Sequence, residues 1–155
     1  MPLKLNVELT EEQRSTLATI PATSWFTQVV YRNVSSPAHP HRELIENNEM
    51  KIAMVQDWIA RAVPGRRVLD LFCANGAFSV MAAQAGAKEV VGLDFAEERI
   101  RCAKFVAGTI QADCSMEFRH GDVYRIGEYF KEPFDVSYGA MSSRSVASTD
   151  PLWGT

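Results

Sequence analysis

Three aspartates stand in or directly after short apolar runs of the sequence: Asp70, Asp94 and Asp122. Carboxylates at the carboxyl ends of neighbouring parallel strands lie at one edge of a sheet, where open α/β proteins bind their ligands. A carboxylate there accepts hydrogen bonds from the hydroxyls of a ribose, or attracts a charged amino group. The spacing of these acids therefore predicts a site for a nucleotide or nucleoside.

The segments around the first two acids predict how they are positioned. Residues 68–72 form an apolar run broken by Asp70, small turn residues follow, and residues 77–85 favour a helix. A second apolar run, residues 89–93, ends at Asp94. This pattern predicts a strand, a tight turn, a helix and a second parallel strand, which together form a right-handed βαβ unit.

Further elements extend this unit into an α/β fold. The longest helical periodicity covers residues 42–62, and a capping-box signature at Thr10 starts a short helix. Residues 96–108 predict another helix, and residues 115–119 and 134–138 predict two more strands. The expected fold is a Rossmann-like parallel sheet with flanking helices, which stops after its fourth strand.

Other segments are harder to interpret. Residues 24–33 are apolar but match neither period, and we expect a mixed segment that packs on the domain or forms part of a lid. The alternative is that its aromatic side chains cover a sheet edge. A proline-rich loop follows, in which His39 and His41 are expected to be exposed. We divide the chain into an N-terminal extension (1–40), the first half of a ligand-binding domain (41–141) and a Ser-rich tail (142–155).

The early end of the predicted sheet has two interpretations. Residues 149–153 resemble the start of another helix, which the chain does not continue. A sheet that stops at its fourth strand leaves a backbone edge unpaired. We therefore expect either a fragment of a longer domain or a chain completed by a partner, such as a second copy that covers the exposed edge.

Composition and charge leave the chemistry to these local motifs. The chain of 155 residues is 46% apolar with a net charge of -3, which is typical of a globular protein and gives no basic footprint for nucleic acid. The cysteines have no CxxC spacing and the histidines lack metal-ligand spacing, so we expect no metal site. Without an apolar leader or a membrane-length run, we expect a cytoplasmic protein that spans no membrane.

The turn after the first strand separates the candidate ligands. A dinucleotide fingerprint needs Gly-x-Gly-x-x-Gly, but Phe72, Ala74 and Ala77 occupy its positions and only Gly76 is a glycine. The chain also lacks the Gly-Lys-Ser/Thr of a P-loop. Asp70 would repel a pyrophosphate but attract the amino group of a methionine-like tail. These features favour S-adenosylmethionine over a nicotinamide dinucleotide.

Four motifs carry a family resemblance. Val-Leu-Asp-Leu-Phe-Cys-Ala-Asn-Gly-Ala-Phe-Ser resembles motif I of the class I S-adenosylmethionine-dependent methyltransferases, whose pattern is acid-x-Gly-x-Gly-x-Gly. Gly-Leu-Asp-Phe, His-Gly-Asp-Val and Pro-Phe-Asp-Val are similar to three later motifs, in the same order, and the resemblance covers residues 55–136. Phe72 and Ala74 replace the first two glycines, and a Leu-Phe-Cys version is familiar among methyltransferases that act on RNA.

The resemblance implies a role for each matching residue. Asp94 would hold the ribose hydroxyls, Phe95 would flank the adenine, and Asp122 would bond the adenine amino group. From the residues alone, capping the turn remains the alternative role for Asp70, and capping the next helix the alternative role for Asp94. The residues implied to contact S-adenosylmethionine are Asp70, Phe72, Cys73, Ala74, Asn75, Gly76, Asp94, Phe95, Gly121, Asp122 and Val123.

The methyl acceptor is not identified by these motifs. Ser-Trp-Phe before the long helix, together with residues 85–94, is similar to the branch that alkylates the wobble uridine of tRNA. A tRNA and a small molecule both remain candidate acceptors, and so does a binding-only module without catalysis. No general base is named, because methyl transfer from a sulfonium needs mainly in-line positioning.

Overall fold

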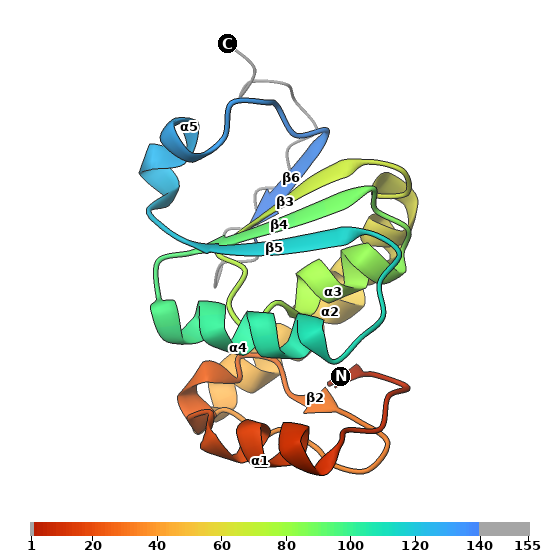
Figure 1. Cartoon of the computed structure of the whole chain (residues 1–155), viewed down its shortest axis with the longest axis vertical. Helices are drawn as coiled ribbons and strands as arrows, with labels where there is room; N and C mark the ends of the chain where they lie inside the picture. Colours follow the sequence, from red (N-terminus) through yellow and green to blue (C-terminus); the bar gives the residue numbers. More distant parts are fainter. Residues whose placement is uncertain (1, 140–155) are drawn as a thin grey trace.

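A parallel four-stranded sheet lies at the centre of residues 2–139, the part of the chain that this computed structural model describes (Figure 1). The predicted strands are confirmed, and all neighbouring pairs are parallel. The Ser-rich tail, 142–155, lies outside the described residues. In spatial order the strands are β5 (Ser115–His120), β4 (Glu89–Asp94), β3 (Arg67–Leu71) and β6 (Val136–Gly139).

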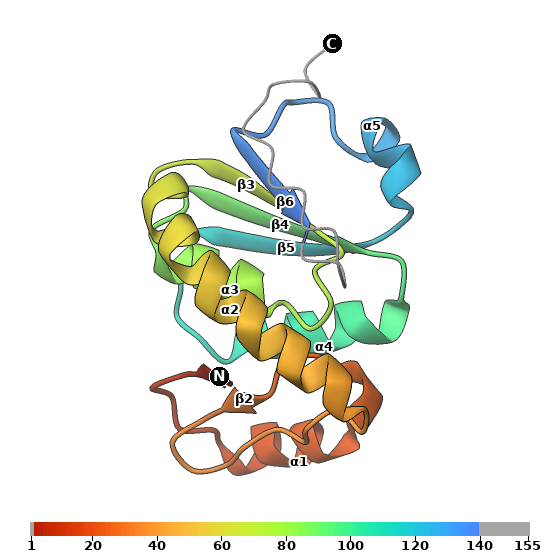
Figure 2. The ribbon, with the colours of Figure 1, turned by 180° about the vertical axis from the view of Figure 1, so that it is seen from behind.

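Three helices cover one face of this sheet (Figures 1 and 2). They are α2 (Arg42–Ala62), α3 (Ala77–Gln84) and α4 (Glu97–Gly108), and their bounds agree with the sequence periodicity to within one residue. The α2 and α3 side chains share a core cluster with Val68, Val90 and Val136 of the sheet. In residues 2–139 no helix combines the length and the apolar character needed to cross a bilayer.

Short elements surround this core. The N-terminal part contains β1 (Leu3–Lys4), α1 (Glu11–Thr19), the 3-10 helix η1 (Ala22–Ser24) and β2 (Val29–Val30), and β5 is followed by η2 (Val123–Arg125) and α5 (Ile126–Tyr129). The predicted capping box is present, because Thr10 Oγ1 accepts from Gln13 N at 3.1 Å and Gln13 Oε1 accepts from Thr10 N at 2.9 Å. Strands β1 and β2 form a separate parallel pair.

The N-terminal elements pack against the helices, which confirms the expectation that residues 24–33 pack on the domain, but on its helices rather than along a sheet edge. Trp25 is fully buried and meets the Phe105 ring of α4 edge-on, with centroids 6.4 Å apart. The physical reason lies in α3, which is apolar all round and must be covered on both sides. Its Ala77 and Val80 join the N-terminal cluster, while Phe78 joins the sheet cluster.

Candidate functional site

The turn between β3 and α3 has an unusual backbone. Phe72 and Ala74 have positive φ values of 58° and 49°, and Gly76 has a φ of 77°. Residues other than glycine seldom adopt such values, and for a bulky side chain they are genuine outliers that cost about 1–3 kcal/mol each. Phe72 and Ala74 are the positions where the resembled motif has glycine. The chain therefore keeps the glycine-type turn with only the last of the three glycines, Gly76.

Hydrogen bonds to β4 hold this turn in place. Cys73 N donates to Leu93 O at 3.1 Å, and Ala74 N donates to Asp94 Oδ2 at 3.0 Å. The other Asp94 oxygen, Oδ1, accepts from Ala96 N at 3.0 Å, just before α4 begins. Asp94 is fully buried and thus ties the turn to the start of α4. These two bonds account for about half of the roughly four hydrogen bonds that a carboxylate can accept, and Arg99 Nη1 lies 3.7 Å from Oδ1.

Asp70 is also fully buried, and only one of its oxygens is satisfied by the described residues. Oδ2 accepts from Ser79 Oγ at 2.6 Å, whereas Oδ1 has no hydrogen-bond partner within residues 2–139. The pKa of this carboxyl is raised to about 7: burial is the largest cause, the Ser79 hydrogen bond opposes it, and the charge of Asp94 adds to the rise. An unpaired buried acceptor is costly, and a cationic donor would satisfy it. Sequence reasoning missed Ser79, although a polar residue in an otherwise apolar part of a helix was a usable signal.

Two predicted site residues in the turn, Cys73 and Asn75, are buried. Burial, with the nearby charges of Asp70 and Asp94, holds the pKa of the Cys73 thiol well above its usual value, so this cysteine is not a thiolate nucleophile. Asn75 is buried and fastens the N-terminal segment: its Nδ2 donates to Thr27 O at 2.8 Å, and its Oδ1 accepts from Thr27 N at 3.4 Å. Sequence spacing gave no sign of this contact.

Gly76 packs inward as well. A β-carbon at this position would lie 3.1 Å from Ala103 Cβ and 3.2 Å from the Phe118 ring. A side chain there would press on α4 and β5, and the positive φ of Gly76 disfavours one in any case. Gly76 therefore allows helix α3 to start close to α4.

The remaining predicted residues lie beside the ends of β4 and β5. Phe95 has a 60% exposed side chain, and its carbonyl lies 2.9 Å from His120 Nε2. Asp122 is exposed, and its Oδ1 accepts from Tyr124 N at 2.9 Å and so caps η2. At Gly121 a β-carbon would come within 2.8 Å of the Tyr129 ring. Val123, which opens η2, is half-buried.

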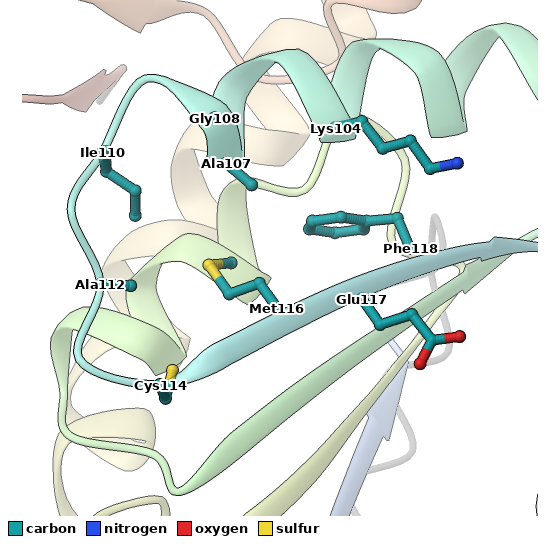
Figure 3. Close-up of a pocket in the computed structure, with 9 residues that line it drawn as sticks. All are labelled: Lys104, Ala107, Gly108, Ile110, Ala112, Cys114, Met116, Glu117 and Phe118. Carbon is teal, nitrogen blue, oxygen red and sulfur yellow. The ribbon is translucent and has the colours of Figure 1, made fainter.

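The site contains a small hollow, and a larger one lies elsewhere. The small hollow, about 40 Å³, is lined by turn residues 72–75, by Ala77 and Phe78 of α3, and by Phe26 and Thr27 of the N-terminal segment. The larger hollow, about 630 Å³, lies between α4 and β5 and opens at the sheet edge (Figure 3). None of the predicted site residues lines the larger hollow. We place the site at the small hollow, because the strained turn lines it and Asp94 is hydrogen-bonded to Ala74 of that turn.

The profile of a family described as a methyltransferase domain matches residues 62–151. The chain belongs to this family. The match begins at the end of α2 and includes every residue of β3, α3, β4, α4, β5 and β6. It therefore confirms the coarser prediction of a Rossmann-like methyltransferase fold.

Curated relatives of this methyltransferase domain are named for ribosomal RNA. A 23S rRNA (uracil(1939)-C(5))-methyltransferase from a Shewanella species is 38% identical over 76 residues, which are 49% of this chain and 16% of the relative. A ribosomal RNA large subunit methyltransferase I from Tolumonas auensis is 37% identical over 78 residues, covering 46% of this chain and 20% of the relative. The chain thus spans a fifth or less of the length of these relatives.

A solved structure shares the fold. Magnesium protoporphyrin IX methyltransferase from Synechocystis PCC 6803, determined with bound SAM, aligns with a TM-score of 0.52 and 25% identity. The alignment covers 61% of this chain and 44% of that protein. The names of these relatives do not include the wobble-uridine branch, so that finer expectation stays a prediction.

Proposed function

We propose that this chain binds S-adenosylmethionine at the carboxyl ends of β3 and β4 and forms the cofactor-binding part of a methyltransferase. The observation that carries the proposal is the pair of fully buried carboxylates, Asp70 and Asp94, on either side of a glycine-type turn. Family membership and the fold shared with a protein determined with bound SAM support it. When bound, this cofactor supplies a methyl group already activated on a sulfonium.

Each acid has a part in this proposal. The unpaired Oδ1 of Asp70 receives the amino group of the methionine tail, directly or through water. The free lone pairs of Asp94 accept the ribose hydroxyls, while its backbone bonds hold the turn. Phe95 flanks the adenine, and Asp122 accepts from the adenine amino group. The residues proposed to complete the site are Phe72, Cys73, Ala74, Asn75, Gly76, Gly121 and Val123.

The acceptor we propose is an RNA base. The relatives named as ribosomal RNA methyltransferases support this choice, and their similarity covers 46% to 49% of the chain. The wobble uridine of tRNA rests on the short sequence likenesses alone. A small-molecule acceptor is the alternative, since the structural neighbour is named for magnesium protoporphyrin IX. Transfer of a labelled methyl group to total RNA, but not to a small-molecule pool, would distinguish the two.

A calorimetric titration with S-adenosylhomocysteine tests the cofactor proposal. We expect binding by the chain and a loss of about 1–3 kcal/mol of binding free energy in Asp94→Ala, which leaves polar groups unpaired. Asp94→Ala also removes hydrogen bonds that hold the turn, so Asp70→Asn serves as a second variant. The control is Asp113→Asn, which changes an exposed acid outside the site. A folded chain that binds no S-adenosylhomocysteine contradicts the proposal. Binding without methyl transfer to any acceptor would favour a binding-only module.

We also propose that a second copy of the chain covers an exposed sheet edge. Strands β5 and β6 are the outer strands of the sheet formed by the described residues, and each has only one neighbouring strand there. Open edges of this kind pair with other chains unless they are protected.

A further inference from the structure

The N-terminal segment reaches the candidate site although it precedes the matched family region. Phe26 and Thr27 line the small hollow from one side, and turn residues 72–75 line it from the other. In Figure 1 the orange N-terminal segment passes beside the first turn of α4, and η1 contacts that helix. A ligand that extends from Asp70 to Asp94 passes over this turn, so it meets the N-terminal segment there.

The segment is fixed at this place by the amide of Asn75. This side chain bonds both the N–H and the carbonyl of Thr27, so it pairs with the backbone of the segment as a neighbouring strand would. Both residues are buried. Phe26, the preceding residue, is therefore held beside the turn.

A cation between two rings holds the Phe26 side chain. The Arg99 guanidinium carbon lies 4.3 Å from the centroid of Phe26 and 5.2 Å from that of Phe95. Its Nη1 lies 3.7 Å from Asp94 Oδ1, so one side chain contacts the proposed ribose acid, the proposed adenine neighbour and Phe26. Cation–π contacts of this geometry are favourable, and a planar guanidinium stacks better than an ammonium.

His39 also lies beside the Phe26 ring. The His39 ring lies 5.1 Å from the Phe26 ring and 5.4 Å from His41. His39 is 6% exposed, so the prediction that it is exposed was wrong: the proline-rich loop folds back onto Phe26. Burial, with the charges of His41 and Arg99, lowers the pKa of His39. A neutral ring therefore lies against Phe26.

We propose that Phe26 is a ligand-contacting residue of this site and that Arg99 is the residue that positions its ring. This inference rests on the proposed function, because the ligand is S-adenosylmethionine. The hollow of about 40 Å³ is smaller than a drug-sized ligand pocket of roughly 300 Å³ or more. Residues that line the hollow therefore have to move apart when the cofactor enters, and we expect the Phe26 ring to move outward and then to lie against the cofactor.

Titration with S-adenosylhomocysteine tests this contact. Phe26→Ala is expected to weaken binding about tenfold, within the range for losing one aromatic stacking partner, and Phe26→Leu by less. The matched control is Phe105→Ala, because the Phe105 ring packs on Trp25 but does not line the hollow. That control loosens the N-terminal packing and should leave affinity unchanged. Arg99→Lys, which keeps the charge without the planar group, should weaken binding less than Arg99→Ala.

A direct readout separates contact from a purely structural role. In Phe26→Trp the new indole fluorescence should change saturably with added S-adenosylhomocysteine, whereas Phe105→Trp should show no such change. Unchanged affinity in Phe26→Ala, with tight binding by the unaltered chain, overturns this inference and leaves the proposed function standing. An unaltered, folded chain that binds no S-adenosylhomocysteine overturns both.

Discussion

At the scale of single residues, strain at Ala74 lies next to the proposed ligand. Its φ of 49° is a glycine conformation, and Ala74 N also donates to Asp94. Ala74→Gly removes the steric strain but adds backbone freedom to the unfolded chain, so we expect a net gain of about 0.5–1 kcal/mol in the free energy of unfolding. Urea titration measures this. The control Ala60→Gly, at an exposed position inside α2, should lose a similar amount.

The pKa of Asp70 makes a second residue-level prediction. Burial raises it from 3.8 to about 7, so the folded protein retains a proton that the unfolded chain releases between these values. The free energy of unfolding therefore falls as pH rises from 3.8 to about 7. The Asp70→Asn variant cannot ionise at this position, so its free energy of unfolding does not fall in this way. The free energy of unfolding of the variant minus that of the unaltered chain should therefore be about 1–3 kcal/mol larger at about pH 8 than at about pH 5. Equal differences at both values would show that Asp70 titrates normally.

Affinity for the ligand should also depend on the ionisation of Asp70, but it should rise with pH where the free energy of unfolding falls. The amino group of S-adenosylhomocysteine interacts best with an ionised Asp70, so binding requires loss of the proton held below pH about 7. We expect affinity to increase as pH rises through that value and Asp70→Asn to remove the increase. Calorimetry in two buffers of different ionisation enthalpy measures the proton released. No pH dependence in the unaltered chain would contradict the amino-group contact.

The sequence placed the acids correctly but not their partners. Asp70 and Asp94 were predicted at strand ends because strand periodicity is a local property, and both are there. The bond from Ser79 to Asp70 and the bonds from Asn75 to Thr27 join residues that no short-range pattern relates. The positive φ values at Phe72 and Ala74 could not be predicted for another reason, because Phe and Ala rarely adopt that conformation.

At the scale of elements, the N-terminal segment is fixed by Trp25. This side chain is fully buried, and its Nε1 has no hydrogen-bond partner among the described residues. Trp25→Ala should therefore lower the free energy of unfolding by about 3–5 kcal/mol. Trp25→Phe removes the unpaired Nε1 donor, which stabilises the fold, but also removes buried volume, which destabilises it. Because these effects oppose each other, we expect the free energy of unfolding to change by less than about 1 kcal/mol. Chemical denaturation of both variants measures the difference.

Elements with a periodic pattern were predictable, and the two-residue strands were not. The 21 residues of α2 carry enough turns for the apolar stripe to fix both ends. Strands β1 and β2 have two residues each, so no alternation exists to detect. Their pairing depends on Leu3 N donating to Gln28 O and Leu5 N to Val30 O, which are contacts between distant parts of the chain.

At the scale of the whole molecule, the described residues form three layers. The sheet is one, the helices α2, α3 and α4 are the second, and the N-terminal elements pack on α3 and α4 as the third (Figures 1 and 2). The candidate site lies where the sheet ends and the N-terminal segment meet. This arrangement explains why a site proposed from the strands alone omitted Phe26.

The outer edge of β5 gives the last prediction, the proposed second copy. Antiparallel pairing of two β5 strands centred on Phe118 would place Glu117 of one copy opposite Arg119 of the other, and the reverse, on one face of the joined sheet. Opposite charges at such cross-strand positions stabilise pairing, whereas like charges oppose it. We expect a concentration-dependent dimer in sedimentation experiments on the chain.

Charge variants of this strand test the register. Glu117→Arg should weaken the dimer, because it places two arginines opposite each other, and Glu117→Arg with Arg119→Glu should restore it. Arg119 also bonds Glu117 and the Tyr129 carbonyl in its own chain, so each variant needs a parallel measurement of folding. If Glu117→Arg alone leaves dimerisation intact, this register is excluded. At about millimolar concentration even a weak dimer, with a binding free energy near −4 kcal/mol, would form. A chain that stays monomeric there excludes the second copy itself.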